Sequence, residues 1–280
     1  MTTPLPVSVV IVSRGRPDAL RRCLMGVAQL QYDPFEVVVV ADPAGCEAVR
    51  GTEMAERIKL VAFDEANISA ARNAGIAQAA GEVVAFIDDD AVPEPTWLRL
   101  LTAPAAMRPD VAAMGGTVRG RNGISFQWRA QGIDAQGEGH PLELKGDAAV
   151  VLHPPEGRAI KTEGTNMAFR RAALVALGGF DPAYRYFLDE TDLNVRLARA
   201  GHATALVPDA QVHHGFAANA LRTSARVPTD LFEIGASWAV FHRKHLAEDA
   251  RASHWQQLRA GQRQRLLRHM VAGTLEPRYV

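Results

Sequence analysis

The stretch that decides the fold is Val83-Val84-Ala85-Phe86-Ile87-Asp88-Asp89-Asp90. Its unbroken apolar half, preceded by Gly81, is typical of a strand buried on both faces, as in a parallel sheet. Adjacent carboxylates are costly unless a cation or hydrogen bonds offset their charge. Because ligands of open α/β sheets bind at the carboxyl ends of the strands, the three acids stand where a ligand site is expected.

Two interpretations of these acids are open. Carboxylate oxygens suit Mg²⁺ and Mn²⁺, so a divalent cation that carries the phosphates of a ligand is the economical explanation. Alternatively, the acids form a solvated turn that leads into a helix beginning near Pro93. The rest of the chain has to decide between them.

Composition narrows the class of protein. The chain has 280 residues, which fits one large domain or one domain with an appendage. Its 31 basic and 31 acidic residues balance, so nothing favours nucleic acid as a partner. Two cysteines, Cys23 and Cys46, are too few for a disulfide framework or a zinc site. Without a signal-like start or an apolar run of bilayer length, we expect a cytoplasmic protein with at most peripheral membrane contact.

Strands and helices alternate in the first part of the chain. Short links between them favour a parallel sheet with right-handed crossovers. The predicted strands are 7–12, 35–42, 58–62 and 83–87, and the predicted helices begin at Pro17 and span 67–80.

The second part is less regular. Residues 119–160 predict a variable excursion with short antiparallel strands, of the kind that often carries recognition. Trp238, Phe241 and Leu246, in the tail, are expected to pack on the core. The remaining predictions are a strand at 164–170, helices at 171–177 and 189–200, an edge strand at 203–207 and two amphipathic helices over 228–269.

Two polar clusters lie where an acidic strand end would need them. Asp189-Glu190-Thr191-Asp192 opens a helix, where acids stabilise the helix dipole by about 0.3–1 kcal/mol each. One of them could instead act as a general base. Asp192 and Arg196 are four apart and can pair, which leaves Asp189 or Glu190 to face a site. His213-His214 are either surface residues or the completion of a metal shell.

Other polar side chains follow the first strands. Arg14 and Arg16 come after the first strand and could reach a diphosphate. Asp42 could accept hydrogen bonds from a nucleobase edge, and Arg72 with Asn73 could hold phosphate or base. Each has a plainer alternative, such as a turn residue before Pro43 for Asp42 or a solvated helix face for Arg72.

In order and spacing, these segments resemble those of family-2 glycosyltransferases, which are inverting, nucleotide-sugar-dependent enzymes of the GT-A fold. The resemblance covers most of the first 220 residues. It rests on Ser13-Arg14-Gly15-Arg16-Pro17, Asn67 through Asn73-Ala74-Gly75, Phe86 to Asp90, Gly164 to Arg171, Gly178-Gly179-Phe180-Asp181, Asp189 to Leu193 with Arg196-Leu197, and His213.

The resemblance implies an α/β fold of GT-A type. A mostly parallel, Rossmann-like central sheet is flanked by helices and joined by a small antiparallel addition and C-terminal helices. It also implies a division into a glycosyltransferase domain at 1–220 and a helical extension at 221–280. Within the domain, about 1–118 would bind the nucleotide and about 119–220 the acceptor.

Roles for single residues follow from the same resemblance. Glu190 occupies the base position, but the usual order of the acids is reversed, so Asp189 stays an alternative. Mn²⁺ or Mg²⁺ would be held by Asp88, Asp90 and His213, with His214 as the alternative histidine. The acceptor residues would be Gly164, Thr165 and Asn166. The donor nucleotide would contact Ser13, Arg14, Arg16, Asp42, Asn67, Arg72, Asp88 and Asp89.

The implied reaction is a single in-line displacement at the anomeric carbon of a nucleoside-diphosphate sugar. The resemblance favours a UDP- or dTDP-sugar as donor. The acceptor is a saccharide, a lipid-linked molecule or a small molecule, and a homodimer is compatible with the C-terminal helices.

Three other functions stay open. A sugar-phosphate nucleotidyltransferase would release pyrophosphate and usually has a glycine-rich loop, whereas Ser13 to Pro17 contains only Gly15. A haloacid-dehalogenase-like phosphatase has its aspartate pair after the opening strand, which here ends in Ser13-Arg14. A non-catalytic nucleotide-sugar binding module would lack metal-dependent nucleotide binding.

Overall fold

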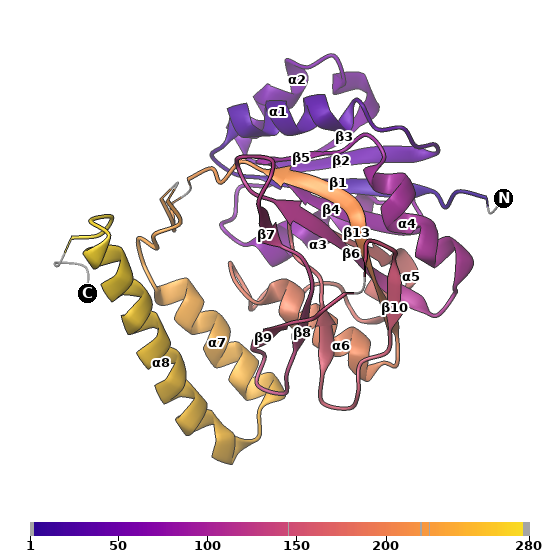
Figure 1. Ribbon diagram of the computed structural model, residues 1–280. Coiled ribbons are helices and arrows are strands. Elements are labelled where there is room, and N and C mark those ends of the chain that lie inside the picture. Colours follow the sequence, from indigo (N-terminus) through magenta and orange to yellow (C-terminus); the bar gives the residue numbers. More distant parts are fainter. Residues whose placement is uncertain (1–2, 145, 219, 224, 277–280) are drawn as a thin grey trace.

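A computed structural model describes residues 3–144, 146–218, 220–223 and 225–276. Its centre is a ten-stranded sheet in which the order β10-β13-β6-β12-β4-β1-β2-β3 is continued by β5 on β13 and β7 on β6 (Figure 1). The strands are β1 (Val7–Ser13), β2 (Phe35–Ala41), β3 (Ile58–Ala62), β4 (Val83–Asp88), β5 (Ala91–Pro93), β6 (Val111–Arg119), β7 (Phe126–Trp128), β10 (Val150–Leu152), β12 (Asn166–Arg170) and β13 (Ala203–His214).

The central sheet is mostly parallel, as predicted. Strands β1 to β4 pair in parallel, and β6 and β13 run in the same direction as they do. Strand β12 runs against its neighbours β4 and β6, as do the three-residue strands β5, β7 and β10 against theirs. The carboxyl ends of β1 and β4 therefore point to one edge, where the acids lie.

Helices cover both faces of the sheet. The core on one face includes side chains of α1 (Pro17–Val27), α2 (Pro43–Arg50) and α4 (Trp97–Met107). The core on the other includes side chains of α3 (Ile68–Gln78), α5 (Arg171–Ala176) and α6 (Asp189–Arg199). A short 3-10 helix, Ala55–Arg57, precedes β3.

Two additions complete the molecule. A small antiparallel sheet joins β8 (Gln131–Ile133), β9 (Gly139–Pro141) and β11 (Ala159–Lys161), inside the excursion that the sequence predicts. Helices α7 (Phe232–His245) and α8 (Glu248–Val271) form a C-terminal hairpin (Figure 1). Trp238, Phe241 and Leu246 are buried there with Tyr184 and Leu188, which confirms their predicted packing. None of the helices in the described ranges has the length and apolar character that a bilayer crossing requires.

Three predictions of local structure were wrong. Strand β6 was missed because its Ala-Ala-Met-Gly-Gly run lacks β-branched residues. The strand predicted at 203–207 is not an edge strand, since β13 extends to His214 and lies between β10 and β6. The helix predicted near Pro93 begins at Trp97, because Ala91–Pro93 pairs with β13 as β5.

Candidate active site

Alternation along β4 separates its terminal acids. Val83, Ala85 and Ile87 belong to the core on the α1 face, whereas Val84 and Phe86 belong to the core on the α3 face. Asp88 continues the second series: Thr165 Oγ1 donates to its Oδ2 at 2.6 Å, and Arg72 of α3 approaches its Oδ1 at 3.7 Å. Asp89 continues the first series toward β1 and α1.

Asp89 anchors Arg16 from within the protein. Its carboxylate is fully buried and accepts from Ser13 Oγ at 2.7 Å and Arg16 Nε at 3.1 Å. Burial raises the pKa of Asp89 to about 7, although the charge of Arg16 opposes this shift. Asp89, for which the sequence predicts a donor contact, lines neither cleft described below. It fixes Arg16, whose Nη1 lies 3.5 Å from Asp90 and has no hydrogen-bond partner among the described residues.

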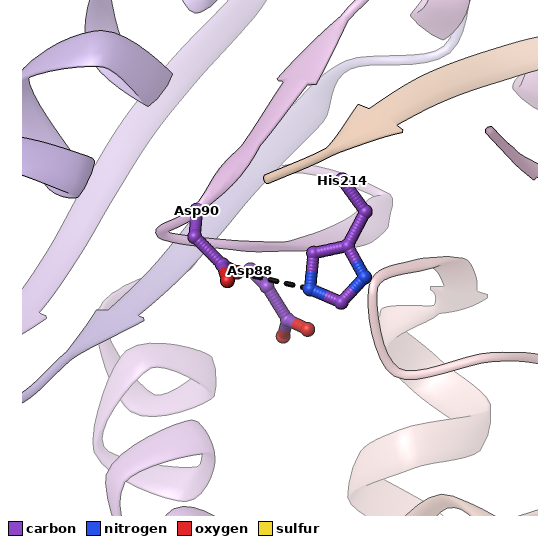
Figure 2. Close-up of side chains that lie close together, drawn as sticks. All are labelled: Asp88, Asp90 and His214. Atoms are coloured by element: carbon purple, nitrogen blue, oxygen red, sulfur yellow. Dashed lines mark ion pairs between the residues drawn. The ribbon is translucent and has the colours of Figure 1, made fainter. Parts of the chain in front are cut away.

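Asp88, Asp90 and His214 form a group that could hold a metal ion (Figure 2). Each offers one ligand atom, and these atoms lie within 4.8 Å of one another. His214 Nε2 and Asp90 Oδ1 are 3.2 Å apart, yet neither makes a well-directed hydrogen bond to a described residue. Two carboxylates and an imidazole are harder ligands than thiolates, and such a set suits Mn²⁺ or Mg²⁺. The two buried atoms without a hydrogen-bond partner, Asp90 Oδ1 and His214 Nε2, also fit a cation between them.

Neighbouring groups orient these ligands. Gln127 Oε1 lies 2.7 Å from His214 Nδ1, and this contact orients the imidazole so that Nε2 faces Asp90. Asp90 Oδ2 accepts from the Ala217 backbone N–H at 2.7 Å. Burial alone would raise the pKa of Asp90, but the contact with His214 and the charge of Arg16 hold it below its usual range.

His213 lies apart from this group. Successive side chains of β13 point to opposite faces, and His213 Nε2 contacts Glu94 Oε1 at 2.6 Å instead. Of the two histidines that the sequence leaves open, the structure thus brings His214, and not His213, beside the two aspartates.

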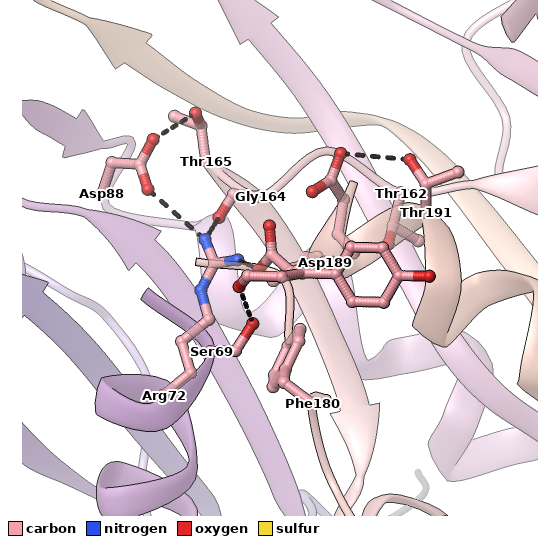
Figure 3. Close-up of polar contacts among 12 residues, drawn as sticks. Ser69, Arg72, Asp88, Thr162, Gly164, Thr165, Phe180, Asp189 and Thr191 are labelled. Carbon is pink, nitrogen blue, oxygen red and sulfur yellow. Dashed lines mark hydrogen bonds and ion pairs between the residues drawn. The ribbon is translucent and has the colours of Figure 1, made fainter. Parts of the chain in front are cut away.

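Arg72 lies between Asp88 and Asp189, the alternative to Glu190 as the predicted base (Figure 3). Its guanidinium is buried over the rings of Phe86 and Phe180, pairs with Asp189, and donates to the Gly164 carbonyl at 3.3 Å. Burial raises the pKa of Asp189 to about 7, and the nearby Glu190 carboxylate adds to this shift while Arg72 opposes it. Asp189 therefore holds Arg72 in place from within the protein.

Glu190 has a different partner. Lys161 Nζ donates to its Oε1 at 2.9 Å. Although burial works against ionisation, the charge of Lys161 lowers the pKa of Glu190 to about 2. Burial raises the pKa of Glu163, which lies in the same region. The sequence reasoning missed Lys161 and Glu163; their signal is two charges, two residues apart, next to Gly164-Thr165-Asn166.

Two clefts meet at these side chains. The first, of about 340 Å³, has an apolar floor that includes Val10, Val40, Phe63 and Phe86. The second, of about 300 Å³, contains Asp189, Glu190, His214, Lys161 and Glu163. Both are lined by Arg16, Ile68, Arg72, Asp88, Tyr186 and Leu221, so the two clefts adjoin at these six side chains.

The remaining predicted residues divide between cleft and interior. Ser13, Arg14 and Asn67 line the first cleft, and Gly164 and Thr165 line the second. Asp42 lines neither, because its two oxygens accept from the backbone N–H groups of Gly15 and Gly45, both at 2.9 Å.

Asn73 and Asn166 hold the fold together rather than facing a ligand. Asn73 exchanges two hydrogen bonds with the backbone of Phe180. Asn166 is fully buried, accepts from Trp97 Nε1 at 2.8 Å and donates to the carbonyls of Thr117 and Ala210. Both side chains are thus engaged within the protein, whereas the sequence predicts an acceptor contact for Asn166 and a ligand contact for Asn73.

Comparison with known proteins gives a consistent result. A family model described as "Glycosyltransferase like family 2" matches residues 4–227. A glucosyl-dolichyl phosphate glucuronosyltransferase of Haloferax volcanii is 30% identical over 191 residues, which cover 63% of this chain and 56% of that protein. The chain thus spans little more than half of that relative.

Solved structures show the same fold. GalNAc-T7 with UDP, GalNAc and Mn²⁺ matches 76% of this chain and 44% of its own at a TM-score of 0.62 and 18% identity. The mannosyltransferase PcManGT of Pyrobaculum calidifontis, with GDP-Man and Mn²⁺, matches 99% of this chain and 83% of its own at a TM-score of 0.56 and 18% identity. The GT-A architecture predicted from the sequence is confirmed by this likeness.

Proposed function

This chain belongs to the family of glycosyltransferase-like family 2 proteins, and on that premise we propose that it transfers a sugar from a nucleoside-diphosphate donor to an acceptor hydroxyl. The proposed reaction depends on Mn²⁺ or Mg²⁺ and inverts the anomeric configuration. The first cleft takes the nucleoside, as its apolar floor fits a base and ribose, and the second takes the acceptor. A UDP- or dTDP-sugar is the expected donor.

Asp88, Asp90 and His214 are the proposed metal ligands. Their convergence and the unpartnered Asp90 Oδ1 and His214 Nε2 support a cation in this position. When bound, the metal supplies a Lewis acid that offsets negative charge on the departing diphosphate. Asp88 is the exposed member, with a side chain 24% accessible, so it faces the cleft where phosphates would enter.

Two arginines assist the departure of the diphosphate. Arg16 and Arg72 line both clefts, and buried aspartates hold their guanidinium groups in place. Preorganised cations lower the free energy of a transition state in which negative charge develops, because they need no reorganisation during the reaction.

Glu190 is the proposed general base. Its side chain lines the acceptor cleft, is 13% accessible and is ionised, so it is placed to accept the proton of a hydroxyl there. The ion pair with Lys161 lowers its pKa and weakens it as a base, so the proposal rests on its position in the cleft. Asp189 instead pairs with Arg72 and is 3% accessible, which suits a positioning residue. Attack by the deprotonated hydroxyl on the side opposite to the diphosphate gives inversion.

One observation carries the proposal: Asp88, His214 and Glu190 line the same cleft, and Asp88 also lines the adjoining first cleft. The test is a thermal-shift screen of nucleoside diphosphates with Mn²⁺, with Mg²⁺ and with EDTA. We expect one nucleotide to raise the melting temperature with metal and to lose this effect in EDTA, since a ligand of the folded state stabilises it by mass action.

The product identifies the reaction. With the donor that this screen selects, release of nucleoside diphosphate supports glycosyl transfer, whereas release of pyrophosphate from a sugar phosphate and a nucleoside triphosphate would indicate a nucleotidyltransferase. If the protein binds the nucleotide in a metal-dependent way but transfers no sugar to any acceptor supplied, a non-catalytic binding module is favoured.

A further inference from the structure

The second cleft contains three arginines that the proposed transfer does not use. Arg222 and Arg226 come from the loop at 221–229, and Arg265 comes from α8. We refer to these three residues as the arginine cluster. It joins two segments that are far apart in the sequence but meet at the acceptor side of the site.

The backbone is arranged to present this cluster. Arg222 forms an isolated β-bridge with Pro228, so the loop folds back on itself. Arg226 has a φ of 62°, a left-handed conformation that non-glycine residues adopt at a cost of about 1 kcal/mol or more. Arg265 Nη2 donates to the Arg226 carbonyl at 3.2 Å, which fixes α8 against the loop.

The charge of the cleft calls for an anion. Its described lining holds six cationic side chains and four carboxylates. Arg72 is paired with Asp189, Lys161 with Glu190, and Arg16 with Asp89, which lies outside the lining. The arginine cluster is the part of the excess that these pairs leave. Burial and then the nearby charge of Arg222 lower the pKa of Arg226, and Glu163 is the carboxylate whose charge opposes this shift. Gathering like charges in a partly buried site is unfavourable unless an anion binds there.

We propose that the arginine cluster binds a phosphate group carried by the acceptor, next to the hydroxyl that receives the sugar. This inference rests on the proposed function. Guanidinium groups bind phosphate oxygens through paired, charge-assisted hydrogen bonds. The cluster does not line the first cleft, and Arg265 lies beyond residues 4–227, the part that matches the family. A residue outside the shared domain suits the acceptor of this chain better than a donor nucleotide.

Phenyl phosphate is a suitable probe, because it is a soluble monoester and its neutral counterpart, phenol, tests the apolar contribution. It is titrated calorimetrically into the full-length protein, first without nucleotide and then saturated with the selected nucleoside diphosphate and Mg²⁺. We expect binding in both states, weakened roughly tenfold in Arg226→Gln and in Arg265→Gln, as expected for losing a hydrogen bond to a charged group. Phenol should not bind measurably.

Matched measurements separate this idea from others. Arg263→Gln alters an exposed arginine of the same helix and should leave phenyl phosphate affinity unchanged. If Arg226→Gln and Arg265→Gln weaken the nucleoside diphosphate and not phenyl phosphate, the cluster serves the donor and the proposal is overturned. Unchanged phenyl phosphate affinity in both variants overturns it too, provided that their melting temperatures match the wild type.

Failure of the proposed function gives a different pattern. If no nucleoside diphosphate binds but the nucleotide-free protein still binds phenyl phosphate through Arg226 and Arg265, the glycosyltransferase assignment falls while the anion site stands. Arg226→Lys and Arg265→Lys keep the charge and lose the paired geometry. Partial recovery of affinity in them would identify charge as the main contribution.

Discussion

Glu190 and Asp189 are adjacent, yet they depend on different cations, and their substitutions should therefore differ. Glu190 is held by Lys161, whereas Asp189 holds Arg72. Glu190→Gln keeps the shape but cannot accept a proton, so we expect kcat for sugar transfer to fall by about 10²- to 10⁴-fold while the dissociation constant of the nucleoside diphosphate stays within about twofold.

Asp189→Asn should give the opposite signature. Without its carboxylate partner, Arg72 is no longer fixed beside Asp88, so nucleotide affinity should fall along with turnover. Steady-state kinetics and calorimetry on both variants measure the two effects. A proton acceptor at position 189 would be indicated if Asp189→Asn abolished transfer with unchanged nucleotide affinity while Glu190→Gln remained active.

The two histidines at the end of β13 allow an equally sharp comparison. Because His214 lies beside Asp90 and His213 contacts Glu94, His214→Ala should weaken Mn²⁺ binding at least about tenfold. His213→Ala is the matched control and should bind Mn²⁺ as the wild type does. Titration of Mn²⁺ followed by electron paramagnetic resonance, in the presence of nucleoside diphosphate, reports both; a larger loss in His213→Ala would contradict the ligand assignment.

For single residues, the sequence predicted which residue types form the site better than it predicted where their side chains point. Asp88 and Asp90 could be placed because a buried strand leads directly to them. The choice between His213 and His214 depends on which face each occupies, and this required knowing that β13 continues to His214. Lys161 escaped attention because a lysine near Gly164 has no distinctive spacing relative to Glu190, which is remote in sequence.

Among the elements, β12 is positioned by Asn166 rather than by its own ladder alone. The Asn166 amide links β12 to α4 through Trp97, to β6 through Thr117 and to β13 through Ala210. Asn166→Ala leaves three buried groups without partners, so we expect the free energy of unfolding to fall by at least about 3 kcal/mol in urea denaturation. The acceptor-cleft variant Thr165→Ala should cost less, because its hydroxyl bonds the half-buried Asp88.

Strands with a continuous run of β-branched residues were predicted closely, whereas a strand without such a run was missed. The β-branched runs of β1 and β2 gave strands with nearly correct bounds. Strand β6 was missed because glycine replaces bulk where neighbours crowd it: a Cβ at Gly116 would lie 2.1 Å from the Ala210 carbonyl oxygen. The need for glycine at position 116 comes from the neighbouring strand β13, which is far away in the sequence. The residues around Gly116 therefore do not reveal it.

Helices α6 and α7 are joined by one buried carboxylate with a definite pH response. Asp192 is fully buried and contacts Arg196 at 2.7 Å, as the i,i+4 spacing predicted, together with Lys244 at 2.8 Å and His245 at 2.7 Å. Burial alone would raise its pKa, but His245 and the two cations hold the pKa of Asp192 below its usual range.

The sign of this shift sets the direction of the effect. An aspartate with a depressed pKa in the folded state contributes stability above the unfolded pKa of about 3.9 and loses it as the pH falls. We therefore expect the wild type to lose stability below about pH 4 and Asp192→Asn to lose part of that dependence. Near pH 7 the variant should be less stable by roughly 3–5 kcal/mol, because the ion pair of the buried carboxylate with Arg196 is lost. Equal pH profiles in urea denaturation would contradict this.

Across the whole molecule, the second cleft draws on nearly the entire chain, from Arg16, which precedes α1, to Arg265 in α8. The sequence separated residues 221–280 from the rest as an extension, a division that remains a prediction. The C-terminal hairpin nevertheless packs Trp238 against Phe187, whose side chain lines the second cleft. Lys244 and His245 of α7 also contact Asp192 of α6. These contacts indicate that the hairpin and the sheet fold together.

Trp238→Ala tests that unity. Trp238 is 5% accessible, and removing a buried tryptophan side chain costs about 3–5 kcal/mol. If the chain unfolds as one cooperative unit, calorimetry of the wild type shows one transition, and the variant shows one transition about 10 °C lower. If the hairpin were independent, two transitions would appear and only one would move. Val175→Ala changes a residue that is 61% accessible on α5 and should shift the transition little. If one transition shifts as a whole, Arg265 of α8 is held at the second cleft only while the whole domain is folded.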